Sequence, residues 1–321
     1  MKINENLYWY SKDKPITGFL GRGMSGNVFL LNQGDELWFI DVGVKYLGRP
    51  KRIIKWMRKD GLIPEKVSKV FLTHAHSDHA GAAGFFKDKF NCDVYIHELG
   101  LQYLEHGWDL IWREQEEVSR GLLREFYPIP LCLVKKLVHY SIGDIPQFDA
   151  LTMKDGEIFK GNNFTLEVIH TPGHVSDHCC FYIPENGCVF LGDLIDPSFD
   201  HKASLNFPNS DFKQIYDSIK RIMALNGEIF CATHAKKVHV GQETCWEICQ
   251  GTLDILDQAL ETTITLLKQS NGMKLKEFKG HYPKETWTWQ DQICVPYTII
   301  NYLERQGKIR FENEKFYYID D

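Results

Sequence analysis

The sequence has no long apolar segment. Nowhere in its 321 residues does an apolar run approach the roughly 20 residues that a membrane-spanning helix needs. The first residues, MKINENLYWYSKDKP, also lack the continuous apolar stretch that marks a secretory signal. Both absences favour a cytoplasmic protein without a membrane span.

An excess of positive charge is missing as well. The chain has 37 Lys and Arg residues against 43 Asp and Glu residues, a formal net charge of −6. This balance creates no overall field that would attract nucleic acid or an anionic membrane. The C-terminal part, from about residue 250 to residue 321, is itself slightly acidic, whereas a surface that follows a phosphate backbone should be basic. Nucleic acid is therefore not an expected partner.

The nine cysteines form no recognisable framework. Their number is odd, and most of them lie inside apolar, strand-like segments. Neither Cys179-Cys180 nor the pair Cys245 and Cys249 has the spacing of a zinc ribbon. We therefore expect reduced thiols, no disulfides and no cysteine among metal ligands. Low-complexity segments and internal repeats are also missing.

Strand and helix patterns alternate through the first hundred residues. Residues 26–43 predict a β-hairpin, and residues 51–61 have a helical spacing that stops at Gly61. A buried strand near Val70 leads into a helix that starts near Ala80, and another strand follows at 94–97. Alternation of this kind indicates a layered α/β domain.

The alternation stops between about residues 99 and 148. This stretch is long, rich in aromatic residues and helical in period, with breaks at Pro128 and Pro130, so we expect a helical insertion. A later helix at 208–225 has Asn209, Ser210 and Asp211 as candidate caps. Strand patterns return at 157–159, 164–170, 179–183, 188–191 and 228–233.

The sequence pattern changes again after about residue 250. Residues 252–269 predict an amphipathic helix, and residues 297–320 predict a helix and then a short hairpin that turns at Glu312-Asn313. A helix followed by a small hairpin suggests a winged-helix-like module. We therefore divide the chain into a catalytic domain, 1–248, and a C-terminal module, 249–321, which supplies a dimer surface or a pocket wall.

Three histidines and an aspartate crowd into the segment THAHSDH at 73–79. A strand places residues i and i+2 on the same side, so His74 and His76 should point together from the strand's end. Asp78 and His79 then fall in the turn into the next helix. Imidazole nitrogen and carboxylate oxygen are ligands that Zn²⁺ takes at about 2.0–2.2 Å. This cluster therefore predicts a metal site.

Three more candidate ligands each follow an apolar strand pattern. The segment HTPGH presents His174, FLGD presents Asp193, and FCATH presents His234. Functional residues in layered α/β folds commonly lie where a strand gives way to a loop. We expect these three side chains to join the cluster at 73–79.

The motif order H-x-H-x-D-H, His after Pro-Gly, Gly-Asp and a strand-end His resembles the metallo-β-lactamase superfamily, across roughly residues 18–240. The resemblance implies a four-layer αβ/βα sandwich that binds two metal ions, zinc by preference, with iron or manganese as alternatives. It implies that the first ion is held by His74, His76 and His174, the second by Asp78, His79 and His234, and that Asp193 bridges them. Ala-Thr-His-Ala replaces the frequent Pro-Gly-His-Gly of the family around His234, so His239 is the alternative ligand.

The reaction implied by this resemblance is hydrolysis. A hydroxide that bridges the two ions would attack a small-molecule ester, thioester or lactone, with Asp78 and Asp193 as the catalytic carboxylates. The residual positive charge of the centre would stabilise the developing oxyanion. Two alternatives remain: phosphodiesterase or ribonuclease action, and a non-catalytic ligand-binding role in signalling. β-Lactamase activity is not expected, because those enzymes are usually exported.

Several residues near the ligands allow two interpretations. Asp41, in FIDVG, either supports the ligand loop or only forms a turn, and His178 is interpreted as a hydrogen-bonded structural histidine. Lys236 and Lys237 are either surface lysines or contacts to a substrate anion. The glycine-rich segment at 21–26 lacks the following helix that a dinucleotide site requires, so we expect it beside the metals as a loop.

The helical insertion also has two interpretations. Its large apolar residues either cover the metals as a lid or pack against the body of the protein. A lid would indicate a substrate with an apolar acyl or aromatic part. The residues concerned are Trp108, Trp112, Phe126, Tyr127 and Leu131.

Overall fold

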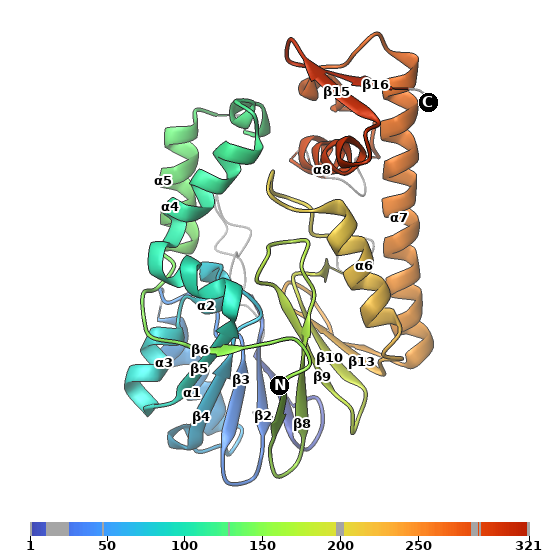
Figure 1. Ribbon diagram of the computed structural model, residues 1–321. Coiled ribbons are helices and arrows are strands. Elements are labelled where there is room, and N and C mark those ends of the chain that lie inside the picture. The colour runs from blue at the N-terminus through green and yellow to red at the C-terminus, as the bar shows by residue number, and fades with distance from the viewer. Residues whose placement is uncertain are drawn as a thin grey trace.

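A computed structural model describes residues 2–10, 26–46, 48–127, 129–196, 202–283, 288 and 290–319. Within these residues, two six-stranded sheets stand face to face (Figure 1). The first contains, in spatial order, β1 (Leu7–Tyr10), β2 (Val28–Asn32), β3 (Leu37–Ile40), β4 (Val67–Phe71), β5 (Asp93–His97) and β6 (Leu151–Met153). The second contains β14 (His239–Val240), β13 (Ile229–Ala232), β10 (Cys188–Gly192), β9 (Cys179–Ile183), β8 (Thr165–His170) and β7 (Ile158–Lys160).

Strand direction brings particular strand ends to one edge of each sheet. In the first sheet, β3, β4, β5 and β6 run parallel. In the second sheet, β9 is antiparallel to both β8 and β10, and β10 is parallel to β13. The carboxyl ends of β8, β10 and β13 therefore lie at the same edge, which places the loops that follow them side by side.

Helices cover the outer faces of both sheets (Figure 1). Helices α1 (Arg49–Lys59) and α3 (Ala83–Phe90) cover the first sheet, and α6 (Phe212–Met223) and α7 (Gln242–Gln269) cover the second. Strand β2 shows how the sequence specifies this layering. Its Val28 and Leu30 face the helices, whereas Phe29 and Leu31 face the other sheet, so both sides of the strand are buried. The predicted four-layer sandwich is confirmed.

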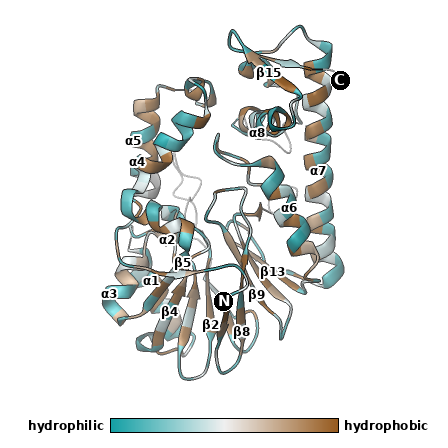
Figure 2. Ribbon diagram, viewed as in Figure 1, coloured by the Kyte–Doolittle hydropathy of each residue, from teal (hydrophilic) through white to brown (hydrophobic). Residues whose placement is uncertain are grey.

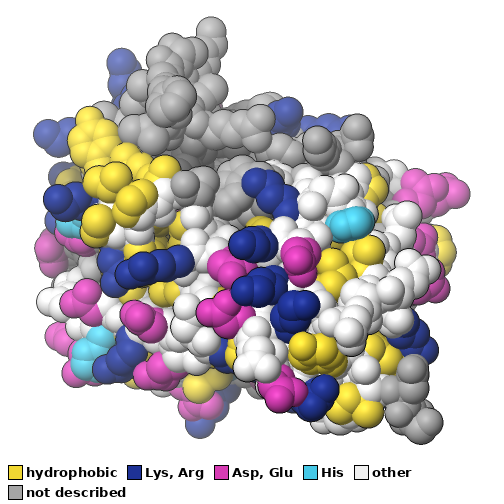
Figure 3. Space-filling view, turned by 90° about the horizontal axis from the view of Figure 1, so that it is seen from above, with side chains coloured by type: hydrophobic (Ala, Val, Ile, Leu, Met, Phe, Trp, Pro, Cys, Tyr) yellow, Lys and Arg dark blue, Asp and Glu magenta, His cyan; other side chains and the backbone are white. Residues whose placement is uncertain are grey.

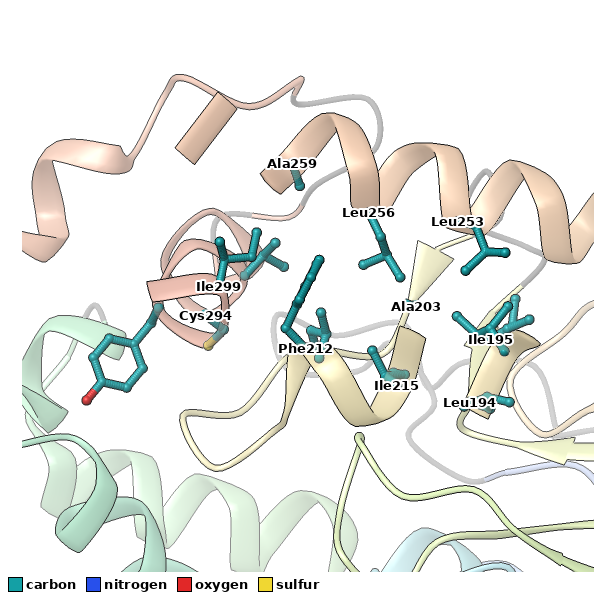
Figure 4. Packing of buried hydrophobic residues seen from close by; sticks show 14 of the residues in the cluster. Leu194, Ile195, Ala203, Phe212, Ile215, Leu253, Leu256, Ala259, Cys294 and Ile299 are labelled. Atoms are coloured by element: carbon teal, nitrogen blue, oxygen red, sulfur yellow. The ribbon is translucent and has the colours of Figure 1, made fainter. Parts of the chain in front are cut away.

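The strands of both sheets are mainly hydrophobic (Figure 2) because they lie in the two inner layers. Outside the second sheet, α6 and α7 pack through another apolar cluster (Figure 4). In it, Phe212 and Ile215 of α6 lie close to Leu256 of α7. Cys294 and Ile299 of α8 (Asp291–Arg305) belong to the same cluster. The C-terminal part therefore shares a core with the second sheet.

The expected insertion consists of helices α4 (Leu101–Val118) and α5 (Leu131–Ile142), with the short helix η3 (Leu123–Phe126) between them. Gly107 interrupts α4 with φ 60° and ψ −145°, a conformation open in practice only to glycine. The helix direction changes there, immediately before Trp108. The insertion stands beside the edge of the sandwich, across from α8 (Figure 1).

After α7, the chain forms helix η4 (Leu275–Phe278), α8 and the hairpin of β15 (Ile309–Glu312) and β16 (Lys315–Tyr318). Asn313 and Glu314 both have positive φ, as a two-residue hairpin loop requires, so the turn lies one residue later than predicted. Helix α7 begins ten residues before the predicted 252, and the predicted boundary at 248 falls inside it. The two-domain division and the winged-helix likeness stay predictions.

The cysteines differ sharply in exposure. All nine lie within the described residues and none forms a disulfide; eight of them are buried, whereas Cys132, near the start of α5, is exposed. Burial raises the pKa of Cys180 and Cys249 to about 12, which keeps these thiols protonated and unreactive. Among the described residues, no helix combines the length and apolar character that crossing a bilayer requires.

Candidate metal centre

The candidate ligands converge at the edge where the strands end. His74 and His76 follow β4, and Asp78 and His79 lie in the first turn of the short helix α2 (Ser77–Ala80). The loops after β8, β10 and β13 supply the remaining three candidates, His174, Asp193 and His234. Together the seven side chains form three overlapping groups whose ligand atoms lie within 4.8 Å of one another: His74, His76 and His174; His74, His79 and Asp193; Asp78, His79 and His234.

The first group consists of three imidazole rings. His76 Nδ1 lies 2.9 Å from His74 Nε2 and 3.3 Å from His174 Nε2. Ligand atoms that surround one zinc ion tetrahedrally at about 2.0–2.1 Å are separated by about 3.3 Å. The spacing of the three nitrogens therefore suits a single shared cation.

The group of Asp78, His79 and His234, with Asp193 beside it, is called the second group below and combines carboxylates with imidazoles. His234 Nε2 lies 3.3 Å from Asp78 Oδ2 and 3.3 Å from Asp193 Oδ1. His79 Nε2 lies 3.3 Å from the same Asp193 oxygen and 3.9 Å from Asp78 Oδ2. These spacings again suit one cation.

Asp193 faces both groups. Its Oδ1 atom belongs to the second group, whereas its Oδ2 atom lies 3.7 Å from His174 Nε2 in the first group. A carboxylate in this position can contribute one oxygen to each of two ions.

Buried polar atoms without hydrogen-bond partners support this fit. Among the described residues, His79 Nε2 and Asp193 Oδ1 are both buried and make no hydrogen bond. A buried polar atom left unpaired costs roughly 1–3 kcal/mol. A cation bound between these two atoms would satisfy both, so the donor set fits a metal ion.

The three imidazole rings of the first group are in their neutral form near neutral pH. Burial, reinforced by the neighbouring histidines, lowers the pKa of His74 well below its usual value and lowers that of His76 to about 3. Burial also lowers the pKa of His174. Neutral imidazole is the form that binds a metal, so no proton competes at this group near neutral pH.

In the second group, the pKa values of the histidines are raised instead of lowered. Burial alone would lower the pKa of His234, but Asp193 and Asp78 raise it to about 10. Burial likewise acts to lower the pKa of His79, yet the carboxylates of Asp193, Asp41 and Asp78 raise it well above its usual value. Without a metal, both imidazoles therefore hold protons, which ion binding must displace.

Asp41 supports the ligand loop directly. Its carboxylate accepts hydrogen bonds from the Thr73 backbone N–H at 2.9 Å, the Thr73 hydroxyl at 2.9 Å and His79 Nδ1 at 2.8 Å. Because Nδ1 of His79 donates its proton to Asp41, Nε2 is the ring atom left to face the centre. Of the two interpretations of Asp41, the supporting role matches these contacts.

His178 acts as a structural histidine, as predicted. Its Nδ1 donates to the Thr171 carbonyl at 3.1 Å, and its Nε2 accepts from the Asp193 backbone N–H at 3.0 Å. Gly192 makes this approach possible: a Cβ atom there would meet His178 Nε2 at 2.5 Å, and its φ is +52°. The glycine of the FLGD segment thus allows Asp193 to reach the centre.

Two supporting groups were not foreseen. The carbonyl of Ser204 accepts a hydrogen bond from His174 Nδ1 at 3.0 Å, and Asp177 Oδ2 accepts from the Ala75 backbone N–H at 2.9 Å. Asp177 could have been suspected from its place beside His178. Ser204 could not, because a backbone carbonyl leaves no mark in a sequence.

Other sequence candidates stand apart from the centre. His239 lies in β14, paired with Phe230, and belongs to none of the three ligand groups found among the described residues. Lys236 and Lys237 are exposed. The glycine-rich segment lies outside the described residues except for Gly26, whose N–H donates to the Asp78 carbonyl at 3.2 Å.

The model of the family described as "Metallo-beta-lactamase superfamily" matches residues 21–234, a range that contains all seven candidate ligands. The chain belongs to the metallo-beta-lactamase superfamily. The match ends at His234 and leaves the C-terminal part outside the family model.

Several relatives of the chain are named as hydrolases. The chain is 27% identical over 178 residues to a hydroxyacylglutathione hydrolase of Haemophilus influenzae, covering 54% of this chain and 71% of that protein. A hydroxyacylglutathione hydrolase of Francisella tularensis subsp. novicida is 30% identical over 144 residues, covering 44% of this chain and 54% of that protein. These likenesses support a metal-dependent hydrolase as the activity class.

Solved structures extend the likeness to the whole chain. A metallo-beta-lactamase family protein from Thermus thermophilus superimposes with a TM-score of 0.74 at 20% identity, covering 99% of this chain and 100% of that one. A beta-lactamase domain protein from Burkholderia ambifaria gives a TM-score of 0.71 at 14% identity, covering 99% and 94%. At these identities the likeness concerns the fold, including the part beyond residue 234.

Around this superfamily centre, the aromatic residues of the insertion have different surroundings. Trp108 is half-buried and stacks on His76, with ring centroids 6.1 Å apart and planes at 18°. Phe126 is fully buried in the cluster that contains α8, and Tyr127 and Leu131 pack against that cluster. Trp112 is buried and lies 5.9 Å from Tyr127, centroid to centroid. Of the five lid candidates, Trp108 borders the ligands, and the others pack within the protein.

Proposed function

We propose that the chain is a dinuclear metal-dependent hydrolase that cleaves a small-molecule ester, thioester or lactone. The observation that carries the proposal is the convergence of seven side chains into groups joined by Asp193. His74, His76 and His174 would hold the first ion, and Asp78, His79 and His234 the second. Asp193 would contribute an oxygen to each.

Two divalent ions held by these residues would lower the pKa of a water molecule toward neutrality and would polarise the substrate oxygen. The protein's own groups fix the direction of the ligands. Asp41 holds the ring of His79, and the Ser204 carbonyl holds that of His174, so each presents Nε2 to the centre. Asp78 and Asp193 supply two negative charges against the four positive charges of two ions, which leaves a positive balance that favours a developing oxyanion.

Zinc is the proposed metal. Neutral imidazole and carboxylate are ligands that zinc binds readily, and the first group is purely imidazole. Iron and manganese are the alternatives to test by elemental analysis.

Thioesters are the first substrates to test, because hydroxyacylglutathione hydrolases are among the relatives. Cleavage of a nucleic acid receives no support from the charge pattern. On the face that Figure 3 shows, basic and acidic side chains are interspersed, whereas a phosphate-tracking surface is basic.

The cytoplasm is the proposed location. The nine cysteines, all within the described part of the chain, form no disulfide, which fits a reducing compartment. A homodimer stays a prediction, which light scattering of the purified protein would test.

The decisive experiment compares substrates with and without metal. Zinc-loaded protein would be assayed on a hydroxyacylglutathione thioester, an N-acyl homoserine lactone, a p-nitrophenyl ester and bis-p-nitrophenyl phosphate. We expect turnover of at least one of the first three, loss of activity on chelation and recovery when zinc is restored. Activity that persists without metal, or that is confined to the phosphodiester, would overturn the proposal.

A matched pair of histidine variants serves as control. His74→Ala removes a candidate ligand, whereas His281→Ala removes an exposed histidine outside the centre. The first should lose activity and bound zinc, and the second should keep both. Equal behaviour of the two variants would contradict the ligand assignment.

A further inference from the structure

Two aromatic rings from distant parts of the chain border the first ligand group. Trp108 of α4 stacks on His76. Phe207 lies 5.3 Å from His76 and 5.7 Å from His174, centroid to centroid. Both aromatic side chains are half-buried, whereas His76 itself is only 6% exposed. Apolar surface therefore meets solvent directly beside the buried candidate ligands.

Phe207 is not held by the protein core. Among the described residues it belongs to none of the three hydrophobic clusters, and the ring contacts found for it are with His76 and His174. Part of the phenyl ring is still exposed and can lose more contact with water when a molecule binds beside it. Its position suits contact with a bound molecule.

The loop that carries Phe207 is tied to His174. Besides the hydrogen bond from His174 Nδ1 to Ser204, the Ser210 hydroxyl donates to the His174 carbonyl at 3.0 Å. The backbone N–H of Asp211 donates to the Gly173 carbonyl at 2.7 Å. These hydrogen bonds hold the loop that contains Phe207 in place relative to His174.

The C-terminal part holds this loop from the other side. Gln290 Nε2 donates to the Asn206 carbonyl at 2.8 Å, and the Cys294 thiol donates to the same carbonyl at 3.3 Å. Arg305 of α8 forms an ion pair with Asp211 at 2.8 Å. The residue next to Phe207 is thus fixed by the start of α8.

The segments that carry the two aromatic residues are also connected to each other. Asn209 Nδ2, in the Phe207 loop, donates to Glu114 of α4 at 3.3 Å, and Glu114 also accepts from Tyr103 at 3.0 Å. A cavity of about 550 Å³ between α4 and α5 is lined by Trp108, Trp112 and Ile145 together with polar and charged residues that include Asp109, Lys135 and Asp144, and Phe207 is not part of its lining. This volume is in the range of small-molecule sites. Space for an elongated group therefore lies next to Trp108.

We propose that Trp108 and Phe207 are specificity-determining residues that contact the apolar acyl part of the substrate. The chemical class is a thioester or ester with an acyl chain of several carbons or an aryl group. Gln290 is a positioning residue that sets the place of Phe207 through Asn206. This inference rests on the proposed hydrolase function and gives the C-terminal part a role in substrate selection.

The test measures kcat/KM for a series of p-nitrophenyl esters from acetyl to octanoyl. Burying one methylene favours binding by a factor of about four, so kcat/KM of the unchanged protein should rise two- to four-fold for each added carbon over the first few. Phe207→Ala and Trp108→Ala should flatten this rise, so that the ratio of kcat/KM for the octanoyl ester to kcat/KM for the acetyl ester falls toward one. Phe207→Leu should restore it, and Trp246→Ala, which alters an exposed aromatic on α7, should leave it unchanged.

The role of Gln290 is tested by non-additivity. Gln290→Ala should raise KM for octanoyl esters about three- to ten-fold with little change in kcat for the acetyl ester. In a Phe207→Ala background the same substitution should have no further effect on the chain-length dependence. A merely structural Gln290 would give the same change in both backgrounds, and that result would overturn its assignment.

A binding measurement separates this inference from the proposed function. Zinc-loaded protein is titrated by calorimetry with straight-chain carboxylates from acetate to octanoate. Affinity that grows with chain length in the unchanged protein but not in Phe207→Ala supports the aromatic contact even if no ester is cleaved. Ester hydrolysis together with length-independent binding would overturn the aromatic contact and leave the hydrolase proposal intact.

Discussion

The two halves of the candidate metal centre differ in charge and in access to solvent. His74, His76 and His174 are neutral, and each is at most 6% exposed. In the second group, the side chains of Asp78 and His234 are 14% and 23% exposed, and the two carboxylates hold protons on the neighbouring imidazoles. The first group could therefore take up a cation without releasing protons, whereas the second would exchange protons for an ion.

This difference suggests a division of roles. The buried imidazole group would retain its ion under a wide range of conditions. The more exposed group faces the solvent, from which substrate arrives, and its affinity is tuned by acid. Asp193 connects the two, because each of its oxygens faces a different group.

Asp193→Asn should have the largest effect, because it removes the charge shared by both halves. We expect kcat/KM to fall by about a thousand-fold or more, the scale of losing a central member of a catalytic unit. Elemental analysis should also show less bound metal. Asp217→Asn, an exposed carboxylate on α6, is the control and should change neither quantity. Full activity of Asp193→Asn would remove the basis for a joined centre.

As the pH is lowered, the second group should lose its metal ion before the first group does. The raised pKa values of His79 and His234 mean that ion binding there releases up to two protons, so affinity should fall by up to about 100-fold for each pH unit lost below neutrality. The first group has no such competition, because the pKa of His76 is about 3.

Elemental analysis after equilibration at fixed free zinc checks this pH dependence. Between pH 8 and pH 5 the zinc content of the protein should drop from about two ions per chain to about one. Simultaneous loss of both ions would contradict the contrast between the groups.

Asp41→Asn should weaken the second group selectively. The carboxylate that fixes His79 is lost, and loss of such a support typically costs 10–100-fold in metal affinity or activity. Asp35→Asn, in the exposed turn between β2 and β3, is the matched control. If the affinity for the first ion fell as strongly as that for the second, the selective role of Asp41 would be wrong.

Lys237→Ala should have the smallest effect. Its side chain is exposed, and exposed charges typically contribute 0–1 kcal/mol, so KM should change by less than about five-fold. Steady-state kinetics with an anionic thioester would measure this. A rise of KM beyond ten-fold would favour the alternative in which Lys237 contacts a substrate anion.

Much of the fold followed from local patterns in the sequence. Continuous apolar runs such as VFLLN specify strands buried on both faces. Asp211 caps α6 by accepting a hydrogen bond from the Gln214 N–H at 3.0 Å, as its position suggested. The edge strands β1 and β6 were not anticipated. Each is only three or four residues long, and pairing with a distant neighbour, rather than local periodicity, defines it.

The candidate ligands were accessible to sequence reasoning because each follows a strand and lies in a short motif, and the structure brings all seven together. Their role as ligands stays a prediction. The surroundings were less accessible: Phe207 carries no motif, and its place beside His76 depends on bonds from Gln290, 83 positions later in the chain. Such long-range contacts are set by tertiary packing, which no local pattern encodes.

The exposure of Cys132 has a practical consequence. A maleimide dye would modify this thiol in the native protein, because the other eight are shielded from reagents. The attached fluorophore would report on the insertion without mutagenesis. Its emission during addition of a candidate acyl compound would reveal whether α5 shifts when the neighbouring cavity fills.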